Sequence, residues 1–502
     1  MISGLASKKH TSDFVNERLP KAAVALGATE VTVSQAGFGG YRIQAGIAHH
    51  ADAFEHALRS GINLIDTSAN YGDGASETLV GEVLGRLIGD GQLDRRALVV
   101  ISKVGYLQGQ NLTLAAEREH AGRPFKDVVP YGEGISHCIH PDFIEDQLTR
   151  SLARLQLTQL DGYLLHNPEY FLDHAHKKGR SVASARREYD ARIAAAFEQL
   201  EREVTTGRIG FYGVSSNTFP AAADAPEFTS LTRLWEMAAS ISPRHHFKVV
   251  QMPFNLVERG AATVPNQPGG ETVLAFARNK NLGGLINRPL NAFDGNHLIR
   301  LADLPLVRGR SENEIIASVR EVSRSEGQLW RRILPRLEVP PALVARIKQQ
   351  IALGDQLKHY WRNFGSFERW RQIEKGNFRP RVQGVVDFLV RTAPDDEDVS
   401  DWIETHQALL KSAYADVASH YQESAARKLG HVRQAAATAD AHWAEADTLS
   451  QLALRALRST TGVTSVLVGM RQHDYVADVV TELKRPVVQA NRTESWQRMR
   501  VV

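Results

Sequence analysis

The sequence predicts an α/β protein, a (β/α)8 TIM barrel with a large helical insertion between strand 7 and helix 7. Short apolar runs alternate with amphipathic stretches at the spacing typical of parallel β/α units. Eight such runs can be counted along the chain. The chain has 502 residues, whereas one barrel needs about 250. A second domain or a large insertion is therefore expected.

The strands are predicted from apolar runs, several of which end in a polar or glycine residue. In chain order they are 31–40, 62–66, 98–103, 161–166, 209–214, 248–252, 284–287 and 465–468. The helices between them are predicted at 50–60, 75–88, from 141 onward, and at 187–206, 271–279, 449–457 and 473–483. The Gly-, Pro- and charge-rich connection 105–140 is expected to be a loop on the active face. Residues 1–30 are expected to form an arm and a short hairpin at the base of the barrel.

About 180 residues separate strand 7 from strand 8, where an ordinary β/α unit needs about 35. We therefore expect a barrel formed by 1–294 plus 446–502 and an inserted helix-rich subdomain at 295–445. Five of the seven tryptophans lie in the insertion, and aromatic residues can bury a small core of their own. A connection that leaves strand 7 starts on the active-site face. The insertion is expected to begin there, as a lid or pocket wall, or to lean away and serve assembly.

Composition limits the classes of partner. The net charge of +3 is too small for this length to indicate nucleic acid or an anionic membrane. The single cysteine excludes an internal disulfide framework and a Cys-based zinc cluster. There is no apolar run of about 20 residues and no segment like a signal peptide, so a cytoplasmic protein is expected. The oligomeric state stays open.

Chemically capable side chains stand at or just after three consecutive strand ends. Residues 64–77 read LIDTSANYGDGASE, in which a buried strand ends in Asp66 and Tyr71 follows in a turn-forming loop. The next strand, LVVISK, ends in Lys103, and the strand DGYLLH ends in His166. The carboxyl ends of parallel strands meet on one face, where α/β proteins place their chemistry.

This set resembles the catalytic tetrad of the aldo-keto reductase superfamily, in the order of that family. The resemblance covers about residues 20–300 and 447–483. It implies that Tyr71 is the general acid in carbonyl reduction and the base in alcohol oxidation. Lys103 would lower the pKa of Tyr71 and Asp66 would hold Lys103 charged. His166 would orient the substrate oxygen by donating or accepting a hydrogen bond.

The resemblance also implies residues that hold a nicotinamide cofactor. The family's Ser/Asn pair after strand 5 is matched by Ser215 or Ser216 with Asn217, because this chain has one serine more than many relatives. The glutamine on strand 6 is Gln251. The loop that passes over the cofactor matches Arg288, Pro289 and Leu290, without the stacking aromatic residue that many members have.

Glycines and one arginine complete the predicted cofactor site. Gly39 and Gly40, after the first strand, permit either a cofactor contact or simply a tight turn. Gly469 and Arg471 follow strand 8, where the family binds the adenosine phosphate. An arginine suits a 2′-phosphate, so NADPH/NADP+ is favoured, with NADH possible; the alternative is that Arg471 caps a surface turn.

The resemblance therefore implies an NADP(H)-dependent oxidoreductase with a small carbonyl or alcohol substrate. Two alternatives are kept: a catalytically weak nicotinamide-binding regulatory or scaffold subunit, and a sugar or polyol dehydrogenase. The loop 132–140 holds two histidines and the cysteine, but no other soft ligand cluster joins it. We therefore predict no metal site and favour pocket lining or a plain loop. The substrate itself is set by loops at the barrel mouth.

Overall fold

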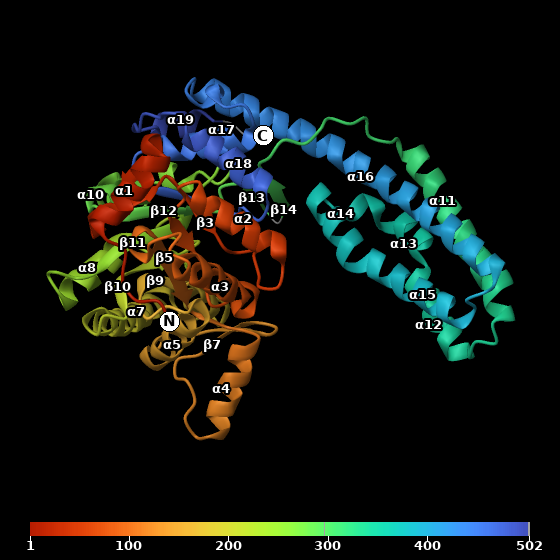
Figure 1. Cartoon of the computed structure of the whole chain (residues 1–502), viewed down its shortest axis with the longest axis horizontal. Coiled ribbons are helices and arrows are strands. Elements are labelled where there is room, and N and C mark those ends of the chain that lie inside the picture. Colours follow the sequence, from red (N-terminus) through yellow and green to blue (C-terminus); the bar gives the residue numbers. More distant parts are fainter. Residues whose placement is uncertain (296, 500–502) are drawn as a thin grey trace. The chain divides into compact units, whose positions relative to one another are not determined.

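The computed structural model describes residues 1–295 and 297–499 (Figure 1). Its described part divides into two compact units. Unit 1 consists of Met1–Leu290 and Ala435–Val502, and unit 2 of Asn291–Gln434. The limits of unit 2 differ from the predicted 295–445. It begins with the hairpin β13–β14 (Asn291–Asp294, His297–Arg300), and its end falls within helix α16 (Glu397–Ala439).

Unit 1 contains a closed barrel of eight parallel strands, which confirms the predicted fold class. Neighbours in the barrel are also consecutive along the chain. The strands are β3 (Ala36–Gly39), β4 (Leu64–Asp66), β5 (Val99–Val104), β9 (Leu160–His166), β10 (Ile209–Ser215), β11 (Phe247–Pro253), β12 (Gly283–Asn287) and β15 (Ser465–Val468). The barrel closes where Val466 of β15 pairs with Ala36 of β3.

A helix follows each barrel strand, as Figure 1 shows around the barrel. These helices are α2 (Ala48–Arg59), α3 (Ala75–Gly89), α5 (Pro141–Leu155), α7 (Val182–Thr205), α8 (Leu231–Ile241), α10 (Val273–Asn279), α17 (Leu449–Arg458) and α18 (His473–Leu483). Apolar residues at helical spacing bury one face of each, as in α3, where Leu79, Val83 and Leu87 are buried. Helix α8 lies in a stretch for which no helix was predicted.

The base of the barrel departs from the sequence prediction. The run 31–40 is two strands and not one: Thr32–Ser34 forms β2, which pairs antiparallel with β1 (Ala23–Ala25), and only β3 joins the barrel. The chain also begins with helix α1 (Lys8–Arg18). The hairpin β1–β2 closes the base, because its apolar side chains join the interior cluster formed by Leu26, Val31, Val33, Leu64, Val99, Ile101, Leu164, Phe211, Val249, Leu285 and Leu467.

The connection 105–140 is folded, contrary to the loop that was predicted. It contains strands β6 (Tyr106–Leu107), β7 (Val129–Gly132) and β8 (Ile135–His137), which form a sheet in the order β6-β8-β7, and helix α4 (Gln110–His120). Its many glycines and charges suit the turns and exposed faces of these short elements. The sheet presents Tyr106 and His137 beside the end of β9.

Unit 2 is helical apart from one hairpin. Its helices include α11 (Glu312–Gln328), α12 (Pro341–Ile351), α13 (Leu353–Tyr360), α14 (Phe367–Ile373), α15 (Arg379–Thr392) and most of α16. One buried cluster contains Trp361 and Trp370, and a second contains Trp402. The buried carboxyl of Glu326 accepts hydrogen bonds from the backbone N–H groups of Leu353 and Gly354, and so caps α13.

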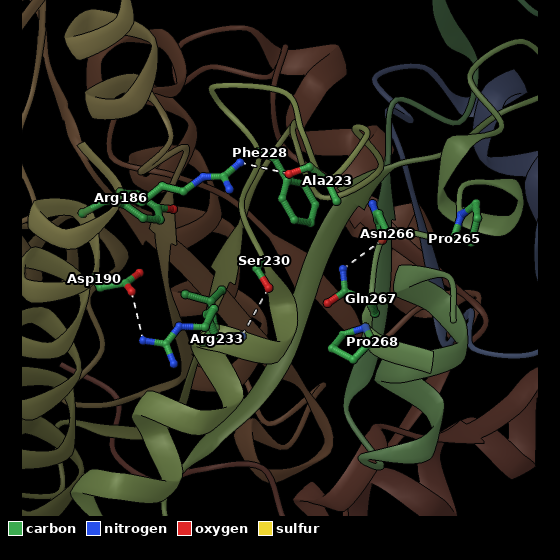
Figure 2. Close-up of a pocket in the computed structure, with 12 residues that line it drawn as sticks. Arg186, Asp190, Ala223, Phe228, Ser230, Arg233, Pro265, Asn266, Gln267 and Pro268 are labelled. Atoms are coloured by element: carbon green, nitrogen blue, oxygen red, sulfur yellow. Dashed lines mark hydrogen bonds and ion pairs between the residues drawn. The ribbon is translucent and has the colours of Figure 1, made fainter. Parts of the chain in front are cut away.

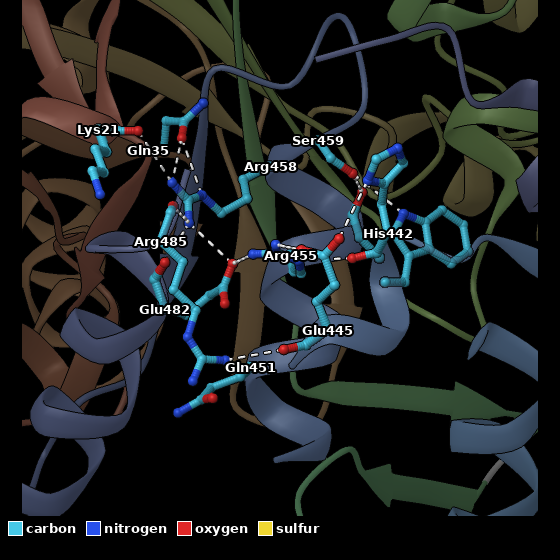
Figure 3. A network of polar contacts seen from close by, with 12 residues as sticks. Lys21, Gln35, His442, Glu445, Gln451, Arg455, Arg458, Ser459, Glu482 and Arg485 are labelled. Carbon is cyan, nitrogen blue, oxygen red and sulfur yellow. Dashed lines mark hydrogen bonds and ion pairs between the residues drawn. The ribbon is translucent and has the colours of Figure 1, made fainter. Parts of the chain in front are cut away.

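A buried charge network ties the last two barrel helices to the first strands (Figure 3). The guanidinium of Arg458, on α17, donates to the carboxylate of Glu482, on α18, at 3.0 Å and to Gln35 Oε1 at 2.9 Å. Arg455 donates to the same carboxylate at 3.0 Å. Burial lowers the pKa of Arg458 to about 10 and raises the pKa of Glu482. Burying these charged groups costs free energy, and only the pairing of the arginines with Glu482 offsets that cost.

Candidate active site

Four predicted catalytic residues meet at the carboxyl end of the barrel. Asp66 ends β4, Lys103 stands in β5 and His166 ends β9, while Tyr71 opens the short helical turn Tyr71–Gly74. The register pairs Asp66 with Ile101 and Lys103 with Leu164, so the neighbouring strands bring their ends side by side.

The ammonium of Lys103 is the centre of this group. Its Nζ donates to Asp66 Oδ2 at 2.8 Å, to the backbone oxygen of Thr67 at 2.9 Å and to the Tyr71 hydroxyl at 3.1 Å. Lys103 is fully buried and Asp66 is nearly so. Burial opposes the charge of Lys103, but Asp66 and Tyr71 together raise the pKa of Lys103 above its usual value. Three acceptors therefore hold a charged lysine in place.

The pKa of Tyr71 differs from the expectation. Lys103 does favour the phenolate, through its charge and its hydrogen bond. Burial is the larger influence, however, and it raises the pKa of Tyr71 above 10. The side chain is thus a neutral phenol at physiological pH, which is the form that can donate a proton.

His166 is held by two hydrogen bonds. Its Nδ1 lies 3.2 Å from Ser68 Oγ, and its backbone oxygen accepts from His137 Nε2 at 2.7 Å. Burial, followed by the charges of Lys103 and His137, lowers the pKa of His166 well below its usual value. The ring lies edge-on to Tyr71, with 5.9 Å between centroids, and edge-on to Tyr106, at 4.9 Å. His166 is therefore a neutral imidazole beside the phenol.

Residues predicted to hold the cofactor ring lie next to this group. Gln251, on β11, donates from Nε2 to Asp66 Oδ1 at 2.8 Å and accepts from Ser215 Oγ at 3.0 Å. Ser215 is the last residue of β10 and pairs in register with His166 and Gln251. Asn217 is exposed, and its backbone N–H donates to Glu169 Oε1 at 2.8 Å. Ser216 is buried, and its hydroxyl also lies within hydrogen-bonding distance of the Thr218 hydroxyl.

The other predicted cofactor residues lie at the ends of β3, β12 and β15. A Cβ on Gly40 would meet Ser76 and the backbone of Asp66. The glycine is therefore needed here for close packing against other residues of the chain. Gly39 lies against Val468 of β15. Arg288, followed by Pro289 and Leu290, forms an ion pair with Glu258 at 2.7 Å.

The segment after β15 is the most open of these. A Cβ on Gly469 would meet no atom within 4 Å. Arg471 lies near His50, on α2. The pKa of His50 is lowered, mainly by burial and then by the charges of His49 and Arg471. Arg471 therefore adds positive charge at the end of β15.

Glu169 is a buried acid that the sequence reasoning missed. It lies three residues after His166, and its Oε2 is buried without a hydrogen-bond partner among the described residues. Burial raises the pKa of Glu169 to about 7, against the hydrogen bonds from Asn217 and Ser216. The only signal in the sequence was an acid directly after the strand-end motif HNP, where a turn acid is common.

This raised pKa predicts a pH-dependent stability. Because the folded protein binds the Glu169 proton more tightly than the unfolded chain does, stability from this group is fully present below about pH 4.5. It falls as the pH rises through about 7. The unfolding free energy of Glu169→Gln, relative to that of the wild type, should therefore rise by roughly 2–3 kcal/mol between about pH 5 and about pH 8. Urea unfolding of both proteins at the two pH values measures the change. A stability difference between the two proteins that is the same at both pH values would contradict the prediction.

A separate cavity of about 520 Å³ lies between α7, α8 and the loop after β11 (Figure 2). Its lining includes Tyr189, Phe228, Arg233 and Gln267, and none of the four predicted catalytic residues. Figure 2 shows that its polar groups face one another, as in the pair Arg233–Asp190 at 3.0 Å. The cavity is therefore distinct from the catalytic group.

Within residues 1–295 and 297–499, no group of three or more His, Cys, Asp or Glu side chains is arranged to hold a metal ion. Cys138 is buried and its thiol donates to the backbone oxygen of Lys126 at 3.3 Å. Among the helices of the described chain, none combines the length and apolar character that crossing a bilayer requires.

Comparison with known proteins gives consistent matches. The chain is 30% identical over 151 residues to the NADH-specific methylglyoxal reductase of Escherichia coli (strain K12), covering 28% of this chain and 41% of that protein. It is 26% identical over 199 residues to aldo-keto reductase family 4 member C11 of Arabidopsis thaliana, covering 40% of this chain and 50% of that protein. The chain thus matches half or less of the length of these curated relatives.

Solved structures that match the chain include aldo-keto reductase AKR11C1 from Bacillus halodurans (holo form), with a TM-score of 0.46 and 14% identity over 96% of this chain and 97% of that chain. Another is the glycerol dehydrogenase AKR11B4 from Gluconobacter oxydans, with a TM-score of 0.46 and 14% identity over 95% and 94%. The model of the aldo/keto reductase family matches residues 37–287, which is half of the chain. The predicted resemblance is confirmed: the chain belongs to the aldo/keto reductase family.

Proposed function

We propose that this protein is an NADP(H)-dependent oxidoreductase that reduces an aldehyde or ketone to an alcohol, or catalyses the reverse reaction. The observation that carries the proposal is the buried ammonium of Lys103, 3.1 Å from the Tyr71 hydroxyl and 2.8 Å from Asp66. Membership of the family and the name of the methylglyoxal reductase support a nicotinamide cofactor and a small carbonyl substrate.

The residues present fit a nicotinamide. A carboxamide group needs both donors and acceptors, and amide side chains stand in or just after the carboxyl-terminal part of three consecutive strands. Asn217, after β10, is exposed, and Gln251 lies on β11. Asn287, which ends β12, has a buried Oδ1 without a hydrogen-bond partner among the described residues. Asn217, Gln251 and Asn287 would therefore hold the carboxamide, and Gly469 and Arg471 the adenosine phosphate.

When bound, the nicotinamide supplies or accepts the hydride at the substrate carbon. The residues of the chain manage the proton. Tyr71 donates its phenolic proton to the carbonyl oxygen as negative charge develops there. Lys103 stabilises the resulting phenolate through its charge and its hydrogen bond. Asp66 keeps Lys103 charged and in position, and in alcohol oxidation the same proton returns to Tyr71.

A direct test is to incubate the full-length protein with NADPH or NADH and a panel of small aldehydes and ketones. We expect loss of NADPH absorbance with formation of one alcohol per cofactor oxidised, detected by mass spectrometry. Tight cofactor binding without turnover of any carbonyl or alcohol would instead favour a regulatory subunit. Faster turnover of sugars with NAD+ or NADP+ would favour a sugar or polyol dehydrogenase.

Arg471 should decide the choice between the two cofactors. Arg471→Gln removes a charge-assisted hydrogen bond to the 2′-phosphate, worth about 1.5–3 kcal/mol. We therefore expect the KM for NADPH to rise about ten- to hundredfold, with little change in the KM for NADH. The matched control is Arg498→Gln, which changes an exposed arginine in an ion pair with Glu494. Equal changes for both cofactors would show that Arg471 does not contact the phosphate.

The role predicted for the inserted helices, a lid or pocket wall, stays a prediction. The chain leaves unit 1 at Leu290, three residues after β12 ends at Asn287. We propose that unit 2 affects the choice of substrate, because it is inserted directly after the segment Arg288–Leu290.

A further inference from the structure

The carboxylate of Glu169 joins the segment that follows β9 to the segment that follows β10. The register of these two strands ends with the pair His166 and Ser215. Beyond it, the N–H of Asn167 donates to the carbonyl of Ser215 at 2.7 Å. Two residues after Ser215, the N–H of Asn217 donates to Glu169 Oε1 at 2.8 Å. A side chain thus supplies the next acceptor along the ladder.

The backbone of Asn167 explains why a side chain takes this place. A residue in a parallel ladder bonds two residues of the neighbouring strand, so the regular acceptor for Asn217 would be the carbonyl of Asn167. Asn167 has a left-handed backbone with a φ of 51°, and its carbonyl accepts from the N–H of Tyr170 at 3.2 Å. The chain therefore turns out of the ladder at Asn167, and the carboxylate of Glu169 replaces the lost carbonyl.

Glu169 is costly to bury. It is 3% exposed, and its Oε2 has no hydrogen-bond partner among the described residues. Three tyrosines feel its charge, Tyr106 of β6, Tyr131 of β7 and Tyr189 of α7; burial is the main cause that raises the pKa of each, so all three are neutral at physiological pH. In the described chain, the causes that shift the pKa of Glu169 include no positively charged side chain. A buried acid without such a partner destabilises the fold, so the residue that it holds explains its place better.

The residue held in this way carries an exposed amide at the carboxyl end of the barrel. Asn217 is exposed, whereas Ser215 and Ser216 before it are buried. After it the chain turns, and the N–H of Thr218 donates to Ser216 Oγ at 3.1 Å. Asn217 therefore stands where the strand ends and the loop begins, and the bond to Glu169 fixes its backbone at that point.

We propose that Glu169 is a positioning residue for the nicotinamide cofactor: its carboxylate fixes the backbone of Asn217 and so places the amide that holds the carboxamide. The inference rests on the proposed function. An ionised carboxylate accepts a stronger hydrogen bond than a neutral group does. The pKa of Glu169 is raised to about 7, mainly by burial. The hold on Asn217 is therefore firmest above that pH, where Glu169 is ionised, and weaker below it.

The pH dependence of cofactor affinity tests this role. NADPH fluorescence titrations compare the wild type with Glu169→Gln at about pH 6 and about pH 8, on either side of the pKa of Glu169. At the lower pH both proteins should bind alike, because Glu169 is then protonated. At the higher pH the variant should bind about two- to tenfold more weakly, because a neutral amide replaces the carboxylate. The 2′-phosphate of NADPH titrates in both measurements and cancels from the comparison.

This change is opposite in sign to the change in stability of the same variant. As the pH rises, Glu169→Gln should gain unfolding free energy relative to the wild type while it loses affinity for NADPH. A purely structural role would make affinity follow stability. A deficit in affinity that is equal at both pH values, or smaller at the higher one, would therefore overturn the proposal.

The matched control is Glu201→Gln, on α7. Glu201 also accepts from a backbone N–H, that of His246 at 2.7 Å, but at the amino end of β11. The chemistry of the substitution is the same and the end of the barrel is the opposite one. This variant should bind NADPH like the wild type at both pH values.

Hydrogen exchange reports the hold on Asn217 without cofactor. Glu169→Ala removes the acceptor, so residues 215–219 should exchange faster than in the wild type at the same pH, as followed by mass spectrometry. Glu169→Gln should restore much of the protection, because its amide oxygen also accepts. If Glu169→Ala does not fold, Glu169→Leu replaces it, since leucine fills a similar volume and accepts no hydrogen bond. Equal exchange in the wild type and the acceptor-free variant would overturn the role of Glu169.

The outcomes separate this inference from the proposed function. If the wild type binds neither NADPH nor NADH, the proposed function fails and the inference fails with it. If the wild type binds NADPH and the Glu169 variants bind it equally well at both pH values, the inference alone fails. Weaker binding by Glu169→Gln only at the higher pH, with faster exchange in Glu169→Ala, supports both.

Discussion

Tyr71→Phe should reduce kcat for carbonyl reduction by a factor of about 10²–10⁴ and leave cofactor binding intact. The substitution removes the phenolic proton that passes to the carbonyl oxygen, and positioned general acids contribute a rate factor of that size. It keeps the ring, which lies edge-on to His166 and Tyr41. Steady-state rates with a saturating aldehyde, and titration of NADPH fluorescence for binding, separate the two effects.

The matched control is Tyr163→Phe, which removes a buried phenolic oxygen from strand β9, three residues before His166. In the described structure the hydrogen bonds of Lys103 Nζ go to Asp66, Thr67 and Tyr71 and not to Tyr163, so this variant should turn over normally. If Tyr71→Phe also turns over normally, Tyr71 is not the proton donor and the assignment of all four residues falls with it.

Glu482→Gln should cost the barrel unit about 3–5 kcal/mol of unfolding free energy. Glu482 is fully buried and accepts from both Arg455 and Arg458 at 3.0 Å (Figure 3). Its loss leaves the buried guanidinium of Arg458 without a carboxylate, whereas Arg455 keeps its ion pair with Glu445. Breaking a buried pair on one side costs about that much. Denaturant unfolding measures the loss, and hydrogen exchange locates it in α17 and α18.

The control for this change is Glu494→Gln. Glu494 pairs with Arg498 at the surface, where both side chains are more than half exposed. Exposed pairs contribute about 0–1 kcal/mol, so this variant should unfold like the wild type. Equal stability of the Glu482→Gln and Glu494→Gln proteins would show that the buried arginines find other partners.

Much of the barrel could be predicted because each buried strand corresponds to a short run of apolar residues in the sequence. Strand β15 was predicted residue for residue, and β4 and β9 end at the predicted Asp66 and His166. The run 31–40 misled because a hairpin strand and a barrel strand share the same apolar character. Only their different partners, Ala23–Ala25 and β15, separate them, and partners are not a local property.

The candidate site shows the same limit. The positions of Asp66, Tyr71, Lys103 and His166 at strand ends followed from the sequence, and the structure brings these side chains together. Their roles in catalysis stay predictions. Lys103 does act to lower the pKa of Tyr71, as expected, but burial is the larger influence and raises that pKa overall. Burial depends on how the whole barrel packs. The same holds for Glu169, whose burial and contact with Asn217 no local sequence pattern indicated.

The inserted unit has a consequence for the order in which the chain matures. The barrel closes through β15, which starts at Ser465 and pairs with β3 at the opposite end of the sequence. A ribosome that has made β12 must still make the whole of unit 2 before that last strand exists. During this interval the nascent barrel has two unpaired edges, and such edges are prone to aggregation. Chaperone dependence during translation should therefore be greatest while the inserted helices are being synthesised.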